Sequence, residues 1–143
     1  MVLVRVLVVD DVEDWRKSIS LLLKEYPTIE IVGEASDGVC AVQMAQEMQP
    51  TVILLDIGLP RLDGIQVAGW IRKLSSKSKI IFVSQQIDPD VVHVAMEIGA
   101  SGFVLKSDIV QSLISAIQAA IRGEKFMSNE LVRYLSRDRL KDQ

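Results

Sequence analysis

The sequence lacks the residues on which several common classes of protein depend, because its 143 residues include one cysteine, one histidine and four prolines. Cys40 alone cannot form a disulfide within the chain, and one Cys with one His cannot supply the four ligands of a structural zinc site. No apolar run approaches the roughly 20 residues of a transmembrane helix, and the opening MVLVRVLVVDD has too short an apolar run for a secretory signal. We therefore expect a cytoplasmic protein that does not cross a membrane.

An excess of basic charge is also absent. The net charge is −3, whereas a domain that binds nucleic acid normally carries a basic patch, so composition gives no reason to expect such binding. Cys40, within GVCAVQMAQEM, is interpreted as a small core residue, and His93 as a surface residue without a chemical role. Trp15 and Trp70 are interpreted as residues that pack helices.

Apolar residues, by contrast, are plentiful. The chain is 49% apolar and 24% charged, which is typical of a single globular domain with a substantial core. Short runs rich in β-branched and aromatic residues have the length of strands. These predicted strands cover residues 4–9, 29–32, 52–55, 79–83 and 103–105.

Between these runs the apolar residues change to helical spacing, as in the series Trp15, Ile19, Leu22, Leu23 and Tyr26. Strands that are apolar almost throughout are buried on both faces, which indicates a parallel sheet with helices on each side. The sequence therefore predicts an α/β fold: a single domain with a five-stranded, doubly wound parallel sheet of the flavodoxin-like or CheY-like (βα)5 type.

Polar side chains stand at the ends of four of the five predicted strands. Asp10 and Asp11 end the first strand, Asp56 the third, Ser84 the fourth and Lys106 the fifth. In a doubly wound sheet the ligand site lies outside the carboxyl ends of the strands. Any one of these residues could be a helix cap or a turn residue, but their joint occurrence indicates a functional site.

The chemistry of this set points to phosphoryl transfer. Three carboxylates at one edge repel one another unless a cation lies among them, and an oxygen-rich site of this kind suits Mg²⁺. A lysine and a hydroxyl would provide donors for the oxygens of a transferred phosphoryl group. Asp56, on the central strand, is the best-placed nucleophile and would form an aspartyl phosphate.

Several motifs carry a resemblance to a known family. VLVVDD, LLDIGLPRLDG, FVS and GASGFVLKS, in this order, resemble the receiver (phosphoacceptor) domain of bacterial two-component response regulators, over about residues 3–128. IVGEASDG and AIRGEKFMS are similar in particular to receivers of the NarL/LuxR class, which usually carry a C-terminal helix-turn-helix DNA-binding domain.

The resemblance implies a role for each carboxylate. Asp56 would accept the phosphoryl group from a phosphohistidine on a sensor histidine kinase, in a phosphorelay that requires magnesium. Asp11, Asp56 and the backbone carbonyl of Gly58 would bind the Mg²⁺ ion, while Asp10 would act through a metal-bound water.

The resemblance also implies a conformational switch. Lys106 would pair with the phosphoryl oxygens, Ser84 would move to hydrogen-bond one of them, and Phe103 would rotate inward behind it. These movements would reshape the face made by the fourth helix, the fifth strand and the fifth helix.

The expected function is to control an output. We expect this output to be transcription, through a DNA-binding domain outside this chain, and the phosphorylated form could dimerise. The chain would catalyse only its own phosphorylation and dephosphorylation, and in that sense it is not an enzyme.

Three positions depart from the family pattern, and the first is Ser107, which follows Lys106 where many receivers have proline. The residue after the switch hydroxyl is usually small, but here it is Gln85, followed by Gln86, so we expect these two side chains to tune the lifetime of the phosphorylated form. Gly58 leaves open space two residues after Asp56, where a larger side chain is common.

Two other functions are compatible with an aspartate at a strand end. A phosphatase of the haloacid dehalogenase type would need a second Asp two residues after the nucleophile, and Gly58 occupies that position. A receiver-like interaction module that acts without phosphorylation would be expected to have a damaged site, whereas Asp10, Asp11, Asp56, Ser84 and Lys106 are all present.

The end of the chain is interpreted separately. We place the receiver domain at residues 1–123 and a tail or linker at 124–143. In the tail, Leu131, Val132, Leu135 and Leu140 recur at roughly helical spacing, which predicts a short helix with Ser128 or Asn129 as its N-cap. Nothing after residue 123 is long enough for a helix-turn-helix, so we expect no specific DNA binding by this chain alone.

Overall fold

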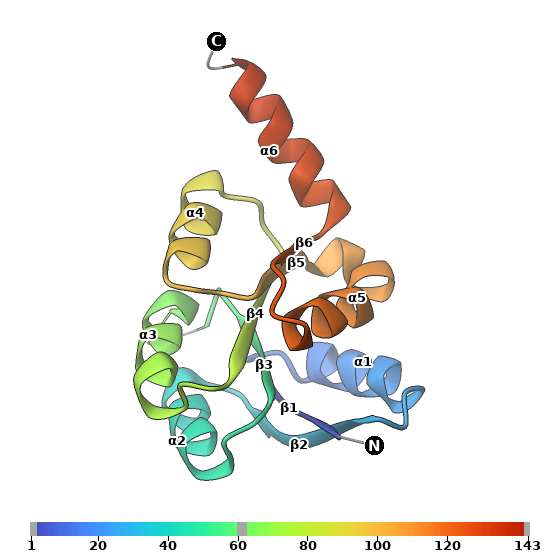
Figure 1. Cartoon of the computed structure of the whole chain (residues 1–143), viewed down its shortest axis with the longest axis vertical. Helices are drawn as coiled ribbons and strands as arrows, with labels where there is room; N and C mark the ends of the chain where they lie inside the picture. The colour runs from blue at the N-terminus through green and yellow to red at the C-terminus, as the bar shows by residue number, and fades with distance from the viewer. Residues whose placement is uncertain (1–2, 60–62, 142–143) are drawn as a thin grey trace.

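The computed structural model describes residues 3–59 and 63–141 and contains a single parallel sheet flanked by helices (Figure 1). Residues 60–62, within the motif LLDIGLPRLDG, lie outside the described part. The strands are β1 (Val4–Val9), β2 (Ile29–Ala35), β3 (Val52–Asp56), β4 (Lys79–Ser84), β5 (Gly102–Leu105) and β6 (Phe126–Met127). The helices are α1 (Glu13–Lys24), α2 (Gly38–Met48), α3 (Gly64–Leu74), α4 (Pro89–Glu97), the 3-10 turn η1 (Lys106–Asp108), α5 (Ile109–Ile121) and α6 (Asn129–Lys141).

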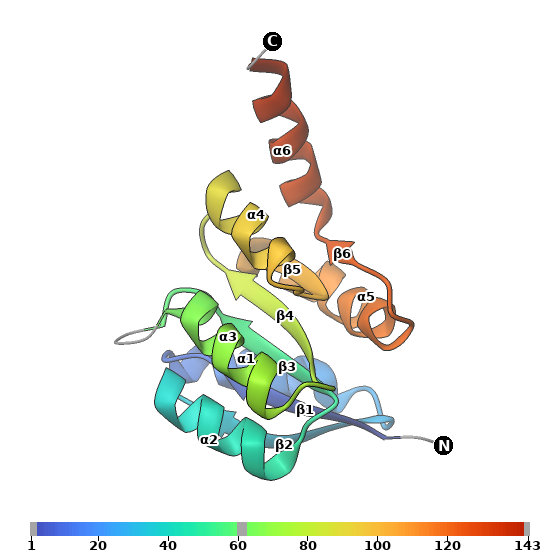
Figure 2. The same ribbon diagram turned by 60° about the vertical axis from the view of Figure 1, so that its left-hand side comes forward.

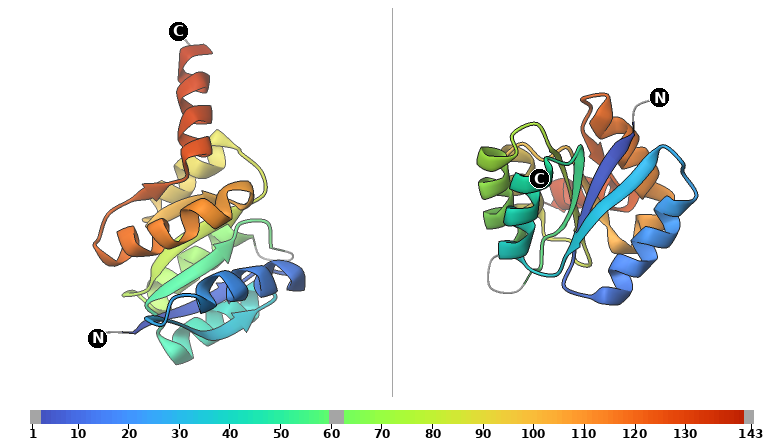
Figure 3. Two further views of the ribbon diagram at one scale, coloured as in Figure 1. Left: turned by 90° about the vertical axis from the view of Figure 1, so that its right-hand side faces the viewer. Right: turned by 90° about the horizontal axis from the view of Figure 1, so that it is seen from below.

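The sheet has the strand order β2-β1-β3-β4-β5-β6, and all neighbours run parallel. Helices α2, α3 and α4 cover one face of the sheet, and α1 and α5 cover the other (Figure 3). The predicted doubly wound parallel fold is therefore confirmed. Strand β3 lies between β1 and β4, so the ends of these three strands meet at the middle of one edge.

The sheet has six strands, so the predicted number of five was wrong. The additional strand β6 pairs with β5 at only two positions, Gly102 with Phe126 and Phe103 with Met127. A two-residue strand has no periodicity to detect in a sequence. It forms because the chain leaving α5 passes the exposed edge of β5, whose backbone groups would otherwise lack partners.

Local capping explains where several helices begin and end. The Asp37 side chain accepts a hydrogen bond from Cys40 N at the start of α2, and Asp63 forms a reciprocal capping box with Gln66 at the start of α3. The chain leaves α4 through Gly99, whose φ of +96° is a left-handed conformation that favours glycine.

The structure places each of the four single residues that were interpreted from sequence. Cys40 is half-buried and packs against the core, as expected, and His93 is exposed and contacts Glu97 on the same helix. Trp15 packs against the core beneath α1 and α5. Trp70, on α3, is 51% exposed, but it lines a hollow with Val39, Val42, Gln43 and Gln46 of α2. It therefore lies beside a neighbouring helix at the surface and not within the core.

The predicted C-terminal helix is present as α6 and projects away from the sheet (Figures 1 and 2). Its first turn is attached to the domain: Ser128 N donates to Phe103 O at 3.1 Å, and Leu131 is fully buried in the core beneath α4. The side chain of Leu140 lies outside the described part. None of the helices that the structure describes is long and apolar enough to cross a membrane.

Burial of Leu131 makes the attachment of α6 testable. Leu131→Ala should lower the free energy of unfolding by about 3 kcal/mol, because a buried leucine is replaced by a cavity. Val132→Ala is the matched control, since Val132 is 46% exposed and its truncation should cost less than about 0.5 kcal/mol. Urea denaturation of both variants measures the difference. Equal effects would show that α6 is not docked through Leu131.

Candidate functional site

The register of the sheet brings the candidate residues to one edge. Asp10 directly follows β1, Asp56 ends β3, Ser84 ends β4 and Lys106 directly follows β5. Asp56 pairs with Val83, the residue before Ser84, and Ser84 pairs with Leu105, the residue before Lys106. Four strands thus present their polar ends side by side, as the sequence predicts.

The three aspartates form a compact cluster. One carboxylate oxygen each from Asp10, Asp11 and Asp56 lies within 4.8 Å of the others, an arrangement that could hold a metal ion. Asp10 and Asp56 are buried, whereas Asp11 is exposed. A donor set made only of oxygen atoms fits a hard divalent cation such as Mg²⁺.

Lys106 is the cationic partner of this cluster. Its Nζ lies 2.8 Å from Asp10 Oδ2 and 3.7 Å from Asp56 Oδ2, and its side chain is 4% exposed. A buried ammonium group is costly unless it is paired. The two carboxylates supply that pairing, and Asp10 is the nearer partner.

Burial raises the pKa of the Asp56 carboxyl above its ordinary value, and the negative charges of Asp10 and Asp11 act in the same direction. The Gly58 N–H and the Lys106 ammonium lower this pKa and only partly offset the rise. One positive charge is shared among three carboxylates, so the folded site favours either a bound cation or a proton on Asp56.

Gly58 contacts Asp56 through its backbone and leaves space beside it. Its N–H donates to Asp56 Oδ1 at 3.0 Å, which orients the carboxylate toward the edge of the sheet. A Cβ atom at Gly58 would lie 3.7 Å from the same oxygen, an ordinary van der Waals distance. Glycine therefore leaves open the space beside the Asp56 carboxylate, as the sequence suggests.

The Ser84 hydroxyl is hydrogen-bonded to the backbone of the loop that follows β4. Its Oγ donates to Gln86 O at 2.9 Å and accepts from Gln86 N at 3.1 Å. The hydroxyl can reach a group on Asp56 only after these bonds are exchanged. Ser84 nevertheless lines a cavity of about 350 Å³ with Asp11, Val12, Asp56, Ile57, Gly58, Gln85, Gln86 and Lys106.

Phe103 lies behind this cavity and does not line it. Its side chain is 1% exposed, and its ring centroid lies 6.0 Å from that of Phe82, its register partner on β4. The ring is thus already inside the core. Gln85 and Gln86, in contrast, are exposed at the mouth of the cavity.

Two residues of the site were not among the candidates from sequence. The Trp15 ring centroid lies 4.9 Å from Lys106 Nζ, and Arg16 Nη1 donates to Asp10 O at 2.7 Å. The sequence feature that could have identified Trp15 is its position four residues after Asp11, which places it in the first turn of α1.

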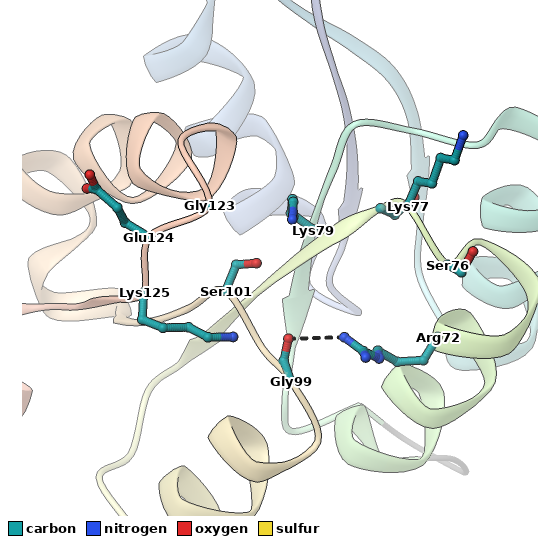
Figure 4. Close-up of a pocket in the computed structure, with 10 residues that line it drawn as sticks. Arg72, Ser76, Lys77, Lys79, Gly99, Ser101, Gly123, Glu124 and Lys125 are labelled. Atoms are coloured by element: carbon teal, nitrogen blue, oxygen red, sulfur yellow. Dashed lines mark hydrogen bonds between the residues drawn. The ribbon is translucent and has the colours of Figure 1, made fainter.

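A second cavity, of about 530 Å³, lies at the opposite edge of the sheet (Figure 4). Its lining includes Arg72, Lys79 and Lys125. Arg72 donates to Gly99 O at 3.3 Å and Lys125 to Ala100 O at 2.7 Å, so these cations hold the turn after α4. No cluster of metal-ligating residues lies there within the described ranges.

Comparison with known proteins decides the family. A family model for the response regulator receiver domain matches residues 6–118. The chain belongs to this family. Its receiver domain is similar to the transcriptional regulatory protein LiaR of Bacillus subtilis, with 38% identity over 129 residues, 90% of this chain and 61% of LiaR. It is also 30% identical to the response regulator VraR of Staphylococcus aureus, over 90% of this chain and 62% of VraR.

This receiver domain spans about three fifths of the length of these relatives. Among solved structures, a LuxR-family response regulator from an Aurantimonas species aligns with a TM-score of 0.90 and 28% identity, covering 96% of this chain and 99% of that one. The receiver domain of the Mycobacterium tuberculosis NarL regulator aligns with a TM-score of 0.74 and 32% identity, covering 82% and 98%. The predicted NarL/LuxR-like receiver is therefore confirmed.

The raised pKa of Asp56 has a consequence for stability. A carboxyl whose pKa is higher in the folded state binds more protons there, so its contribution to stability falls as pH rises from its ordinary value through its folded value. Asp56→Asn removes the charge while its amide oxygen can still accept the Gly58 N–H. In chelator-treated protein we expect Asp56→Asn to raise the melting temperature at pH 7, with a gain that shrinks on acidification.

The control for this measurement is Asp90→Asn, on the exposed first turn of α4. It should change stability by less than about 0.5 kcal/mol. A lower melting temperature for Asp56→Asn than for the wild-type chain would contradict the electrostatic reading of the cluster.

Proposed function

We propose that this receiver domain takes a phosphoryl group from the phosphohistidine of a sensor histidine kinase onto Asp56 and thereby changes conformation. One Asp56 carboxylate oxygen attacks phosphorus, the bond from phosphorus to the histidine nitrogen breaks, and the imidazole leaves with that electron pair. The observation that carries the proposal is the buried arrangement of Asp56, Asp10 and Lys106 beside Asp11, open to a cavity that Ser84 also lines.

Each residue has a distinct part. Mg²⁺ bound by Asp11, Asp56 and the Gly58 carbonyl, with Asp10 acting through a water, would neutralise the carboxylates and stabilise the charge of the transferred group. Gly58 N–H orients the acceptor carboxylate. Lys106 supplies the positive charge that the phosphoryl oxygens need, at the cost of part of its contact with Asp10.

The switch follows from a change of hydrogen-bond partners. In the present conformation Ser84 Oγ is satisfied by the backbone of Gln86. A phosphoryl group on Asp56 offers the hydroxyl a charged acceptor, which forms a stronger hydrogen bond than a neutral one. The phosphorylated form therefore favours a different conformation of the loop between β4 and α4, with Phe103 held inward. A bound group shifts a conformational equilibrium only when it interacts differently with the two conformations, and the Ser84 hydroxyl supplies that difference.

The output is proposed to be control of transcription through a DNA-binding domain outside this chain, as the names of the relatives suggest. The surface of α4, β5 and α5 would pass on the change to a partner, which can be a second copy of the domain. The protein would act in the cytoplasm. It would catalyse only its own phosphorylation and dephosphorylation, and this chain alone would not bind specific DNA.

Phosphorylation by a small acyl phosphate tests the proposal directly. With Mg²⁺ and acetyl phosphate, we expect a single adduct of one phosphoryl group on Asp56, detected by intact-protein mass spectrometry, and no adduct when a chelator is present from the start. Asp56→Asn should abolish it and Asp90→Asn should leave it unchanged. Lys106→Ala should remain folded but switch poorly, because the ammonium that responds to the phosphoryl group is missing. Adduct on another residue of the wild-type chain, or steady release of phosphate without an adduct, would contradict the proposal.

Gln85 provides a second test. Its exposed side chain stands at the mouth of the cavity that contains Asp56, where it can shield the phosphoryl group from water. We expect Gln85→Ala to speed the decay of phospho-Asp56 by about fivefold, equivalent to about 1 kcal/mol in the barrier. Gln43→Ala, at an exposed position on α2, is the control. Decay curves that coincide for Gln85→Ala and the wild-type chain would remove this side chain from the lifetime of the adduct.

A further inference from the structure

Two carboxylates and one aromatic ring lie close to the ammonium group of Lys106. Asp10 Oδ2 lies at 2.8 Å and Asp56 Oδ2 at 3.7 Å. The third neighbour is the indole of Trp15, whose ring centroid lies 4.9 Å from Nζ. This distance is within the range of a cation–π interaction, and tryptophan offers the strongest face for one.

We propose that Trp15 is a positioning residue for phosphoryl transfer, holding the Lys106 ammonium in place beside Asp56 through the face of its indole. The inference rests on the proposed function of the site. It adds a residue on α1 to a set that otherwise comes from the strand ends and the loops that follow them.

The place of Trp15 relative to the cavity supports this role. The cavity that contains Asp56 is lined by Lys106 but not by Trp15, and Trp15 packs against the core beneath α1 and α5. The indole therefore contacts the ammonium from outside the cavity that the phosphoryl group would enter. Since the Lys106 side chain is 4% exposed, the attraction acts in a desolvated setting, where it is strongest.

The start of α1 is hydrogen-bonded to Asp10, at the end of β1. Arg16 donates to Asp10 O at 2.7 Å and to Glu34 Oε1 at 3.2 Å, and Val12 N donates to Asp10 Oδ1 at 2.9 Å. These bonds attach the first turn of α1 to the ends of β1 and β2. Trp15 lies within that turn, so its indole is placed by the same contacts that hold Asp10.

A ring face suits a lysine that must change partners. Lysine is a point charge on a flexible stem of four carbons, and in the present conformation its nearer carboxylate is Asp10. To meet a phosphoryl group on Asp56, the ammonium must shift its hydrogen bonds. A hydrogen-bonding neighbour would resist that shift, because it requires a directed bond. The indole attracts the charge without requiring one, so Lys106 can move toward Asp56 without turning away into solvent.

The chain contains its own control. Its other tryptophan, Trp70, also lies under a lysine: Lys73 Nζ is 5.5 Å from the Trp70 ring centroid. That pair is on the outer face of α3, where Trp70 is 51% exposed. The two tryptophans thus offer the same kind of contact in a buried and in an exposed setting.

The test compares initial rates of phosphorylation by acetyl phosphate in saturating Mg²⁺. Trp15→Leu should slow the reaction by about fivefold, equivalent to about 1 kcal/mol of barrier, because leucine fills space without a ring face. Trp15→Phe should slow it less, because a weaker face remains. Trp70→Leu should leave the rate unchanged. The rise in melting temperature on adding Mg²⁺ should be the same in all these variants, which separates positioning of Lys106 from damage to the carboxylate cluster.

A double-mutant cycle connects the effect to Lys106. In a Lys106→Met background, Trp15→Leu should cause no further loss of rate, since the charge that the indole positions is gone. A fivefold loss in that background would assign Trp15 a purely structural role and overturn the inference. A wild-type chain that is phosphorylated at the same rate as Trp15→Leu would overturn it as well, while leaving the proposed function intact. Failure of the wild-type chain to be phosphorylated at all would overturn the proposed function and this inference with it.

A metal-free measurement checks the contact even if Trp15→Leu does not fold. In a Trp70→Phe background, Trp15 is the single tryptophan of the chain. Lys106→Met should then change the intensity or wavelength of its fluorescence in chelator-treated protein, because a cation leaves the indole face. Unchanged emission would contradict the contact on which the inference stands.

Discussion

The rest of the site depends on the ion pairs that the buried Lys106 ammonium makes with Asp10 and Asp56. Asp10 and Asp56 are both buried, and carboxylates at such short separation would repel one another without a cation between them. Lys106 supplies one positive charge to this cluster, which leaves an excess of negative charge. Burial, together with the charges of Asp10 and Asp11, therefore still raises the pKa of Asp56 above its ordinary value. The site is therefore incompletely neutralised by its own residues. An incompletely neutralised carboxylate site can respond strongly to a cation, whereas a fully paired one would gain little from it.

Strand β5 connects this charge cluster to the C-terminal helix. It carries Phe103 and leads directly into Lys106, while its other edge pairs with β6. Beyond Lys106, the Ser107 hydroxyl donates to Glu130 Oε2 at 2.8 Å and Asp108 accepts from Glu130 N at 3.2 Å. The first turn of α6 thus contacts the two residues that follow the lysine. Two hydrogen bonds therefore attach the segment that follows Lys106 to the helix that projects away from the sheet (Figure 2).

Much of the fold was predictable because parallel strands carry a strong signal. Runs such as 52–55 are apolar on both faces, and the polar residues that end them are conspicuous for that reason. Strand β6 was not predictable, since two residues form no pattern and its pairing depends on how the chain leaves α5. The exposure of Trp70 was not predictable either, because residue type alone does not tell whether an aromatic side chain beside a helix is buried or at the surface. Residues 60–62 of the motif after Asp56 lie outside the described part of the chain.

The sequence by itself determined which residues reach the edge of the sheet, because a strand that ends in a polar side chain must deliver it there once the sheet is parallel. It thereby determined the identities of Asp10, Asp11, Asp56, Ser84 and Lys106. Only the tertiary structure decided how they are paired: that Lys106 lies nearer to Asp10 than to Asp56, that Ser84 is bonded to Gln86, and that Trp15 covers the ammonium. These pairings depend on the register between strands and on the placement of α1 against β1, which are set by packing of the whole core rather than by any local run of residues.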